Sequence, residues 1–180
     1  MQARRATPEL QALVDLFYTQ PSELGTFEEV DPTGLPQPYR TLLNHDEHMT
    51  VTVEAHHGCS VDVQVEQTHF TATHYARKIL LTRKTDGKVA QFGIVRLNLD
   101  SLGAKLRQEI EQQQTPLGRL LIQHDVLRNV RLLSLWKIGA GSDLQRLFGL
   151  KKAAICFGRT ALIYCNGVPA VELLEIVTPE

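Results

Sequence analysis

Three segments in the middle of the chain alternate hydrophobic and polar residues with the period of a β-strand. In the first, residues 61–65, valine occupies every second position. The second and third, residues 74–83 and 88–99, flank the dipeptide Asp86-Gly87, which favours a tight hairpin turn. This pattern predicts three antiparallel strands.

Three further strands are predicted near the C-terminus, over residues 130–138, 153–165 and 168–177. The last two are joined by Asn166-Gly167, another strong hairpin signal. The six strands predict an α+β fold, with a six-stranded, mostly antiparallel sheet and the helices grouped on one face.

Apolar residues with helical spacing occur elsewhere. Thr7-Pro8-Glu9 is typical of a helix start, and the residues that follow have an apolar face. Further helices are expected over 39–43, 101–114 and 116–124.

Residues 44–58 fit two structures, a helix ended by Gly58 or an alternating strand. Asp46, as a helix cap, favours the helix. Residues 20–38 contain four prolines and two glycines and predict a connecting stretch with little regular structure.

The length and composition are those of one globular domain. We expect residues 1–180 to form a single domain, with 1–38 as an N-terminal helix and a proline-rich connecting segment. The formal net charge of -1 offers no overall attraction to nucleic acid or to an anionic membrane. No segment approaches the length of a membrane span, so we expect a cytoplasmic protein.

The three cysteines, Cys59, Cys156 and Cys165, are widely spaced and include no CxxC pair. This spacing is not that of a disulfide framework or a zinc knuckle. No serine or cysteine lies in a recognisable nucleophile motif, so covalent catalysis has no support in the sequence.

Arg77 is the first candidate for ligand recognition. In a strand through residues 74–83 it shares a face with Tyr75, Ile79 and Leu81. If helices cover that face, Arg77 must be paired or must bind an anion, because an isolated buried charge is too costly. A structural ion pair and an outward-facing strand are equal alternatives.

The segment Gln112–Leu120, "QQQTPLGRL", starts a helix at Thr115-Pro116. Thr115 is a good N-cap and Pro116 a favoured first helical residue. The first amides, those of Leu117 and Gly118, can bind a carboxylate or phosphate. Taken alone, however, the segment is more often an ordinary capped helix.

A histidine-rich stretch, "HDEH" at residues 45–48 followed by His56 and His57, raises the alternative of a metal site. His45 and His48 can lie one helical turn apart. The spacing matches no known metal motif, and a solvated polar helix start is the favoured interpretation.

With these residues in hand, the chain resembles the chorismate lyase (chorismate pyruvate-lyase) family from about residue 42 to residue 177, as a diverged branch. Four stretches carry the resemblance: "LLNHDEHMT", "RKILL", "TPLGR" and "NGVPAVELLEIVTP". The resemblance assigns ligand contacts to the backbone amides of Met49 and Leu117 and to the side chain of Arg77. It places the essential glutamate at Glu175.

Two departures from the family pattern concern the same region. Ile94 follows Gly93, where better-known members have an arginine, and one extra residue lies between Pro169 and Glu175. Because of the extra residue, the strand must bulge, or the alignment must shift by one residue. We expect Glu175 to face the cavity and Glu172 to face the other side.

The resemblance implies conversion of chorismate to 4-hydroxybenzoate and pyruvate in a flap-covered cavity, without a metal or an organic cofactor, for quinone or phenolic biosynthesis. Arg77 and Glu175 are the implied catalytic residues. The small-molecule substrate and product are the expected partners. The alternative is a non-catalytic domain of the same fold that binds an aromatic carboxylate as an effector.

Overall fold

The computed structural model describes residues 10–124 and 128–180. The expected helix start at residues 7–9 lies outside these residues. The described helices and strands have the following bounds: α1 Leu10–Asp15, β1 Gly25–Val30, α2 Tyr39–Leu43, α3 Met49–His57, β2 Val61–Phe70, β3 His74–Arg83, β4 Val89–Asn98, α4 Ala104–Glu111, α5 Leu117–Gln123, β5 Arg128–Ala140, α6 Ser142–Phe148, β6 Ile155–Cys165 and β7 Val168–Val177. Short 3-10 turns cover Pro21–Glu23, Pro32–Gly34 and Leu99–Ser101.

The strands form one antiparallel sheet in the order β1-β5-β6-β7-β4-β3-β2. The prediction of an α+β fold with an antiparallel sheet is confirmed, but the strand number is seven among the described residues and not six. The seventh strand, β1, lies inside the proline-rich segment and pairs with β5 at the edge of the sheet. Because prolines and glycines lie around β1, its short alternating pattern is difficult to recognise in the sequence.

Both predicted hairpin turns are present. Gly87 has a φ of 71° between β3 and β4, and Asn166 and Gly167 have φ of 52° and 78° between β6 and β7. Positive φ at both central residues, as at Asn166 and Gly167, is typical of a type I′ turn, whose twist matches that of the paired strands.

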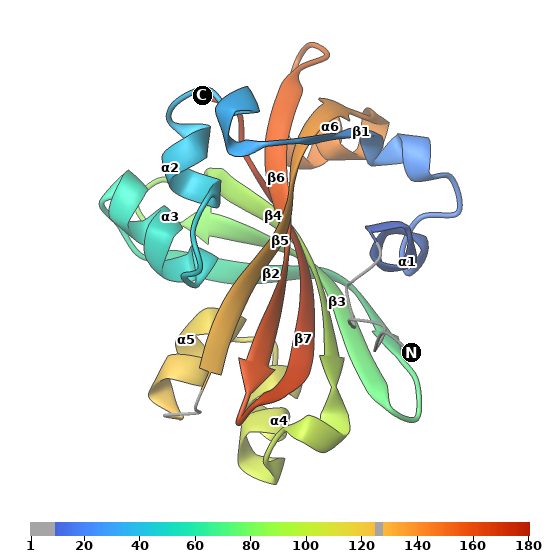
Figure 1. Ribbon diagram of the computed structural model, residues 1–180, viewed down its shortest axis with the longest axis vertical. Coiled ribbons are helices and arrows are strands. Elements are labelled where there is room, and N and C mark those ends of the chain that lie inside the picture. The colour runs from blue at the N-terminus through green and yellow to red at the C-terminus, as the bar shows by residue number, and fades with distance from the viewer. Residues whose placement is uncertain (1–9, 125–127) are drawn as a thin grey trace.

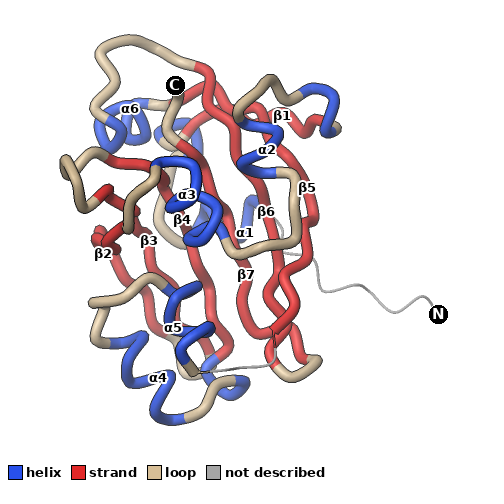
Figure 2. The backbone as a smooth tube through the Cα atoms, turned by 90° about the vertical axis from the view of Figure 1, so that its left-hand side faces the viewer, coloured by secondary structure: helices blue, strands red, loops and turns tan. Residues whose placement is uncertain are grey.

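The helices cover both faces of the sheet, and the prediction that they group on one face is wrong. Helices α2, α3 and α5 lie on one side in Figure 1, and α1 and α6 lie on the other. Figure 2, seen from the side of the first group, shows α2 to α5 in front of the strands. Hydrophobic clusters form on both sides of the sheet.

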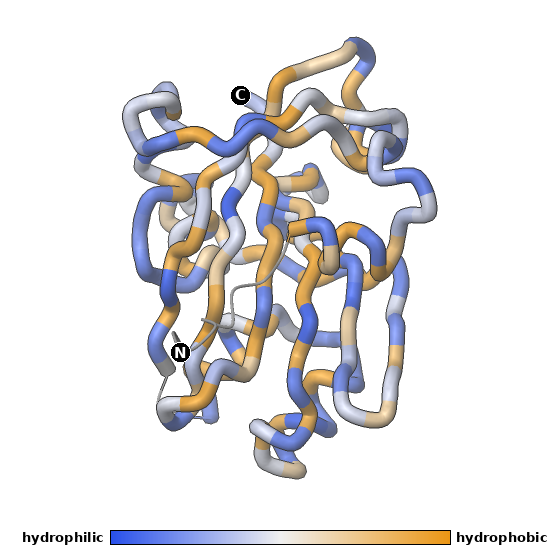
Figure 3. The backbone as a smooth tube through the Cα atoms, turned by 45° about the vertical axis from the view of Figure 1, so that its right-hand side comes forward, coloured by the Kyte–Doolittle hydropathy of each residue, from blue (hydrophilic) through white to orange (hydrophobic). Residues whose placement is uncertain are grey.

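The cause is the composition of the central strands. Phe92, Ile94 and Leu174 pack beneath α1 and α6, while Val95 and Leu173 pack beneath α4 and α5. The hydropathy trace of Figure 3 shows hydrophobic residues along these strands with only short hydrophilic interruptions. A sheet that is apolar on both faces needs cover on both.

The segment 44–58, for which the sequence favours a helix over a strand, contains helix α3. The helix begins later than predicted. Helix α3 has His48 as its N-cap and ends at Gly58, which has a φ of 64°. The Asp46 side chain instead accepts a hydrogen bond from the Leu132 amide at 2.9 Å. Asp46 therefore ties the segment before α3 to the sheet.

Within residues 10–124 and 128–180, every helix is too short or too polar to cross a membrane.

Candidate functional site

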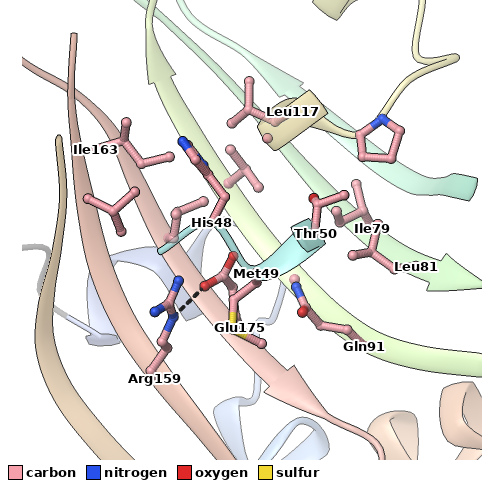
Figure 4. A pocket seen from close by; sticks show the side chains of 16 residues that line it. His48, Met49, Thr50, Ile79, Leu81, Gln91, Leu117, Arg159, Ile163 and Glu175 are labelled. Atoms are coloured by element: carbon pink, nitrogen blue, oxygen red, sulfur yellow. Dashed lines mark hydrogen bonds and ion pairs between the residues drawn. The ribbon is translucent and has the colours of Figure 1, made fainter. Parts of the chain in front are cut away.

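A buried cavity lies between the sheet and the first turns of α3 and α5 (Figure 4). Met49 and Thr50 from α3, with Leu117 and Gly118 from α5, form its roof. Strands β3, β4, β6 and β7 form most of its floor. The floor includes Ile79, Leu81, Gln91, Gly93, Val95, Arg159, Ile163, Leu173 and Glu175.

Two glycines shape this cavity. Gly93 lies opposite Ile79 on β3 and opposite Glu175 on β7, and the Ile79 side chain packs over it, because a Cβ atom there would lie 3.2 Å from Ile79 Cγ1. Gly118 allows α5 to approach α3 closely, because a Cβ atom there would lie 3.0 Å from Thr50 Oγ1 and 3.3 Å from Thr50 Cβ. The two roof helices thus pack directly against each other at their first turns.

Helix α5 begins one residue later than predicted. Its N-cap is Pro116 and not Thr115, and no side chain caps it. The cause is the backbone of Pro116, whose ψ of 140° is extended and lies outside the helical range. Leu117 is therefore the first helical residue, and it lines the cavity.

Glu175 faces this cavity, on the side of the sheet that the sequence pattern predicts. Its side chain is 9% exposed. Glu172 faces the opposite side, where Arg96 donates to its carboxylate, with Nη2 2.8 Å from Oε1. The extra residue before Glu175 is absorbed at Ala170, because Ile163 pairs with Val171 while Tyr164 pairs with Pro169. The strand bulges there, and the register beyond the bulge is regular.

Arg159 is a member of the site that was not predicted. It is fully buried on β6, and its Nε donates to Glu175 Oε2 at 2.8 Å, which is the dashed contact in Figure 4. Its Nη1 donates to the carbonyl of His45 at 2.8 Å, and its Nη2 donates to the carbonyl of Glu47 at 2.9 Å. Arg159 thus joins the cavity floor to the segment that leads into α3.

The hairpin turn contains the signal that would have located Arg159. Counting back from Asn166-Gly167 pairs residue 159 with residue 174, and the bulge at Ala170 shifts that partner to Glu175. The strand pattern therefore places the two charges side by side once the bulge is assigned. The partner of Glu175 is Arg159 and not Arg77, the other buried arginine on this face of the sheet.

Arg77 is also fully buried, on the same face of the sheet as Arg159 and Glu175. Unlike Arg159, it has no carboxylate partner among the described residues. Among the described residues, none offers a hydrogen-bond acceptor to its Nε, Nη1 or Nη2 atoms. Burial lowers the pKa of Arg77, and the nearby Tyr75 hydroxyl offsets this in part without reaching hydrogen-bond geometry. The outward-facing alternative and the ion-pair alternative are both excluded for the described chain.

Arg77 lies beside the cavity rather than among its lining residues. It pairs with Val95 on β4, and Val95 pairs with Leu173 on β7. Val95 and Leu173 both line the cavity. Three of the four residues assigned by the resemblance, Met49, Leu117 and Glu175, therefore line the cavity. The fourth, Arg77, lies on β3 opposite the lining residue Val95.

The histidine-rich stretch does not form a metal site at the cavity. His45 Nε2 lies 2.7 Å from the carbonyl of Leu42. In the described chain, the group with metal-ligand spacing is His56, His57 and Glu180, whose ligand atoms lie within 4.8 Å of one another. None of these three residues lines the cavity, and His56 is hydrogen-bonded to Glu180.

The half-buried His45 should make stability depend on pH. Burial, followed by the charge of Arg159, lowers the pKa of His45 below its usual value of 6.5. The folded state therefore favours neutral His45, and below pH 6.5 the unfolded chain binds more protons and gains stability relative to the fold.

We therefore expect the free energy of unfolding, measured with urea, to fall as the pH drops from about 7.5 to about 5.5. The variant His45→Gln should have a shallower pH dependence, and His69→Gln, an exposed control on β2, should not. Equal slopes for native protein and His45→Gln would contradict this assignment.

Comparisons with known proteins extend to the fold and no further. No family model and no curated protein matches the sequence. Among solved structures, PhnF from Mycobacterium smegmatis is similar at 12% identity and a TM-score of 0.52, over 73% of this chain and 63% of that one.

Two other solved structures have lower TM-scores. Gene product SA0254 from Staphylococcus aureus has 12% identity and a TM-score of 0.49, over 65% of this chain and 82% of that one. The possible transcriptional regulator YydK from Bacillus subtilis has 9% identity and a TM-score of 0.46, over 65% of this chain and 57% of that one. The chain thus has the α+β fold of PhnF, which is the chorismate lyase-like fold.

Proposed function

We propose that this chain is a ligand-binding domain that takes a small carboxylate-bearing molecule into the cavity between the sheet and helices α3 and α5. One observation carries the proposal. The guanidinium group of Arg77 is fully buried, and all three of its nitrogens are without a partner in the described part of the chain.

A buried, uncompensated guanidinium group calls for an anion. Burial of a charge without a partner is strongly unfavourable, and a guanidinium group binds a carboxylate through two parallel hydrogen bonds. The other buried charges of the site already compensate each other, because Arg159 is paired with Glu175. The anion would therefore bind at Arg77.

The cavity must open to admit such a ligand. The volume open to water is ≈ 30 Å³, which is enough for roughly two water molecules. Val95 and Leu173 connect this space to Arg77, and helices α4 and α5 cover that side. Displacement of these two short helices would extend the cavity as far as Arg77 without disturbing the strands.

A chorismate lyase is the second candidate. It is favoured by the meeting of Met49, Leu117 and Glu175 at one cavity, as the resemblance implies for the enzyme. The hydrogen bond from Arg159 argues against it, because a carboxylate that is already engaged is less available to handle a proton. Binding without turnover is therefore the better-supported function.

The two candidates differ in one pair of measurements on the full chain. We expect 4-hydroxybenzoate to bind with a stoichiometry of one in a calorimetric titration, and we expect chorismate to yield no 4-hydroxybenzoate or pyruvate above the uncatalysed rate. EDTA should leave binding unchanged, because the residues with metal-ligand spacing lie away from the cavity.

Turnover of chorismate that follows enzyme concentration would establish the lyase instead. Failure of 4-hydroxybenzoate, benzoate and chorismate to bind would overturn the proposed site. Loss of binding in EDTA, with recovery on adding zinc, would move the site to the histidine-rich stretch.

A further inference from the structure

Besides the guanidinium group of Arg77, which lies beside the cavity, a buried polar atom on the cavity floor also lacks a partner among the described residues. The side chain of Gln91 is 2% exposed and lines the cavity, and no donor within residues 10–124 and 128–180 reaches its Oε1 atom. Buried polar atoms without a hydrogen bond are uncommon in folded proteins, because burial removes their bonds to water. Gln91 Oε1 can therefore accept a hydrogen bond from a molecule in the cavity.

Gln91 lies at the end of the floor that is remote from Arg77. It occupies β4 opposite Leu81, whereas Arg77 lies opposite Val95, four residues further along the same strand. Four residues of a strand span about 13 Å. Along β3 and β4 the floor between these two positions is apolar, with Ile79, Gly93 and Val95, and Glu175 borders it from β7.

Glu175 adds a second acceptor near Gln91. Glu175 pairs with Gly93 and Gln91 pairs with Val177, so the two residues are diagonal neighbours on adjacent strands, a spacing of about 7–8 Å. Figure 4 shows both side chains extending into the same pocket. Gln91 Oε1 and the Glu175 carboxylate are both hydrogen-bond acceptors, so this end of the cavity favours a ligand group that donates a hydrogen bond.

We infer that Gln91 selects ligands that carry a hydrogen-bond donor, a hydroxyl or an amine, at the end opposite their carboxylate. This inference rests on the proposed ligand-binding function and deepens it. Arg77 would neutralise the carboxylate, the apolar floor would contact the body of the ligand, and Gln91 Oε1 would accept the hydrogen bond from the donor. A ligand without the donor would leave this buried carbonyl unpaired.

The test compares four probes by calorimetric titration of the full chain: benzoate, 4-hydroxybenzoate, 4-methoxybenzoate and terephthalate. These keep one carboxylate and vary the group at the far end, which is absent, a donor, an acceptor or a second anion. In the native protein we expect 4-hydroxybenzoate to bind about tenfold tighter than benzoate. We expect 4-methoxybenzoate and terephthalate to bind no tighter than benzoate.

The variant Gln91→Met keeps the length of the side chain and removes the acceptor. Benzoate should bind this variant as it binds the native protein, while the preference for 4-hydroxybenzoate over benzoate should fall several-fold. Gln108→Met, an exposed control on α4, should leave both affinities unchanged. The thermal midpoint of Gln91→Met should equal or exceed that of the native protein, because the change removes a buried unpaired acceptor.

The outcomes separate the two proposals. If benzoate and 4-hydroxybenzoate both fail to bind the native protein, the proposed function and this inference fall together. If benzoate binds but Gln91→Met keeps the native preference, only the role of Gln91 is overturned. A native preference for 4-methoxybenzoate or terephthalate also overturns it, and a fall in the thermal midpoint of Gln91→Met would assign the side chain to structure.

Discussion

Replacement of Arg77 by methionine should abolish binding of 4-hydroxybenzoate and should at the same time stabilise the unliganded protein. The first effect follows from loss of a charge-assisted contact in a desolvated site, which is typically worth about 2–5 kcal/mol, so that affinity should fall by about 30-fold or more. The second follows because the guanidinium group is buried without a partner among the described residues. Its removal should relieve a penalty of about 1–3 kcal/mol.

The conservative variant Arg77→Lys should also bind weakly. Lysine keeps the positive charge, but it lacks the planar pair of donors that matches a carboxylate. Calorimetric titration measures affinity, and urea unfolding measures stability. A variant Arg77→Met with native affinity, or with reduced stability, would show that Arg77 serves packing and not ligand binding.

Arg96→Met is the matched control for Arg77→Met. Arg96 also lies in the central sheet, but it faces the other side and is paired with Glu172. Its replacement should lower stability by about 1 kcal/mol, because the pair is partly exposed, and should leave ligand affinity unchanged. Opposite effects on stability at Arg77 and Arg96 would distinguish a charge kept for a ligand from one kept for the fold.

Replacement of Arg159 by methionine should have the opposite effect on stability, with a loss of about 3–5 kcal/mol. The change leaves the Glu175 carboxylate buried without its partner, and it frees the carbonyls of His45 and Glu47. Urea unfolding at neutral pH measures this loss. If the variant does not fold, Arg159→Lys, which keeps the charge, should fold with an intermediate stability.

The double variant Arg159→Met with Glu175→Leu tests the cause of this loss. Removing both charges of a buried pair is often neutral, whereas removing one is not. The double variant should therefore recover part of the stability lost in Arg159→Met. Additive losses from the two single replacements would mean that the pair itself contributes nothing and that the carbonyl contacts of Arg159 dominate.

The sequence predicted those parts of the fold that depend on local patterns. The two hairpins follow from Asp86-Gly87 and Asn166-Gly167, because few residue types adopt the required positive φ. Strand β1 was not predicted, because its pairing with β5 is a long-range contact and its neighbours are prolines and glycines. The sequence also did not predict that helices cover both faces of the sheet, because the apolar central strands do not show by themselves which helices pack on them.

The site was predicted in part, for a related reason. Alternation along β7 placed Glu175 and Glu172 on opposite faces, and alternation along β3 placed Arg77 on an apolar face. The partner of Glu175 depends on the register of β6 against β7, which the bulge changes by one residue. Arg159 and Gln91 also look ordinary in sequence, because what distinguishes them is burial at the cavity.

The position of the bulge at Ala170 has a consequence for comparing this chain with the family that its sequence resembles. It lies between the hairpin turn and Val171, so the added residue is accommodated before the paired part of β7 that carries Glu175. A residue added near the tip of this hairpin therefore does not change the face of the sheet on which each later side chain lies. Spacing measured from the glycine of the turn is therefore a poor guide to equivalent residues, and spacing measured from the end of the strand is a sound one.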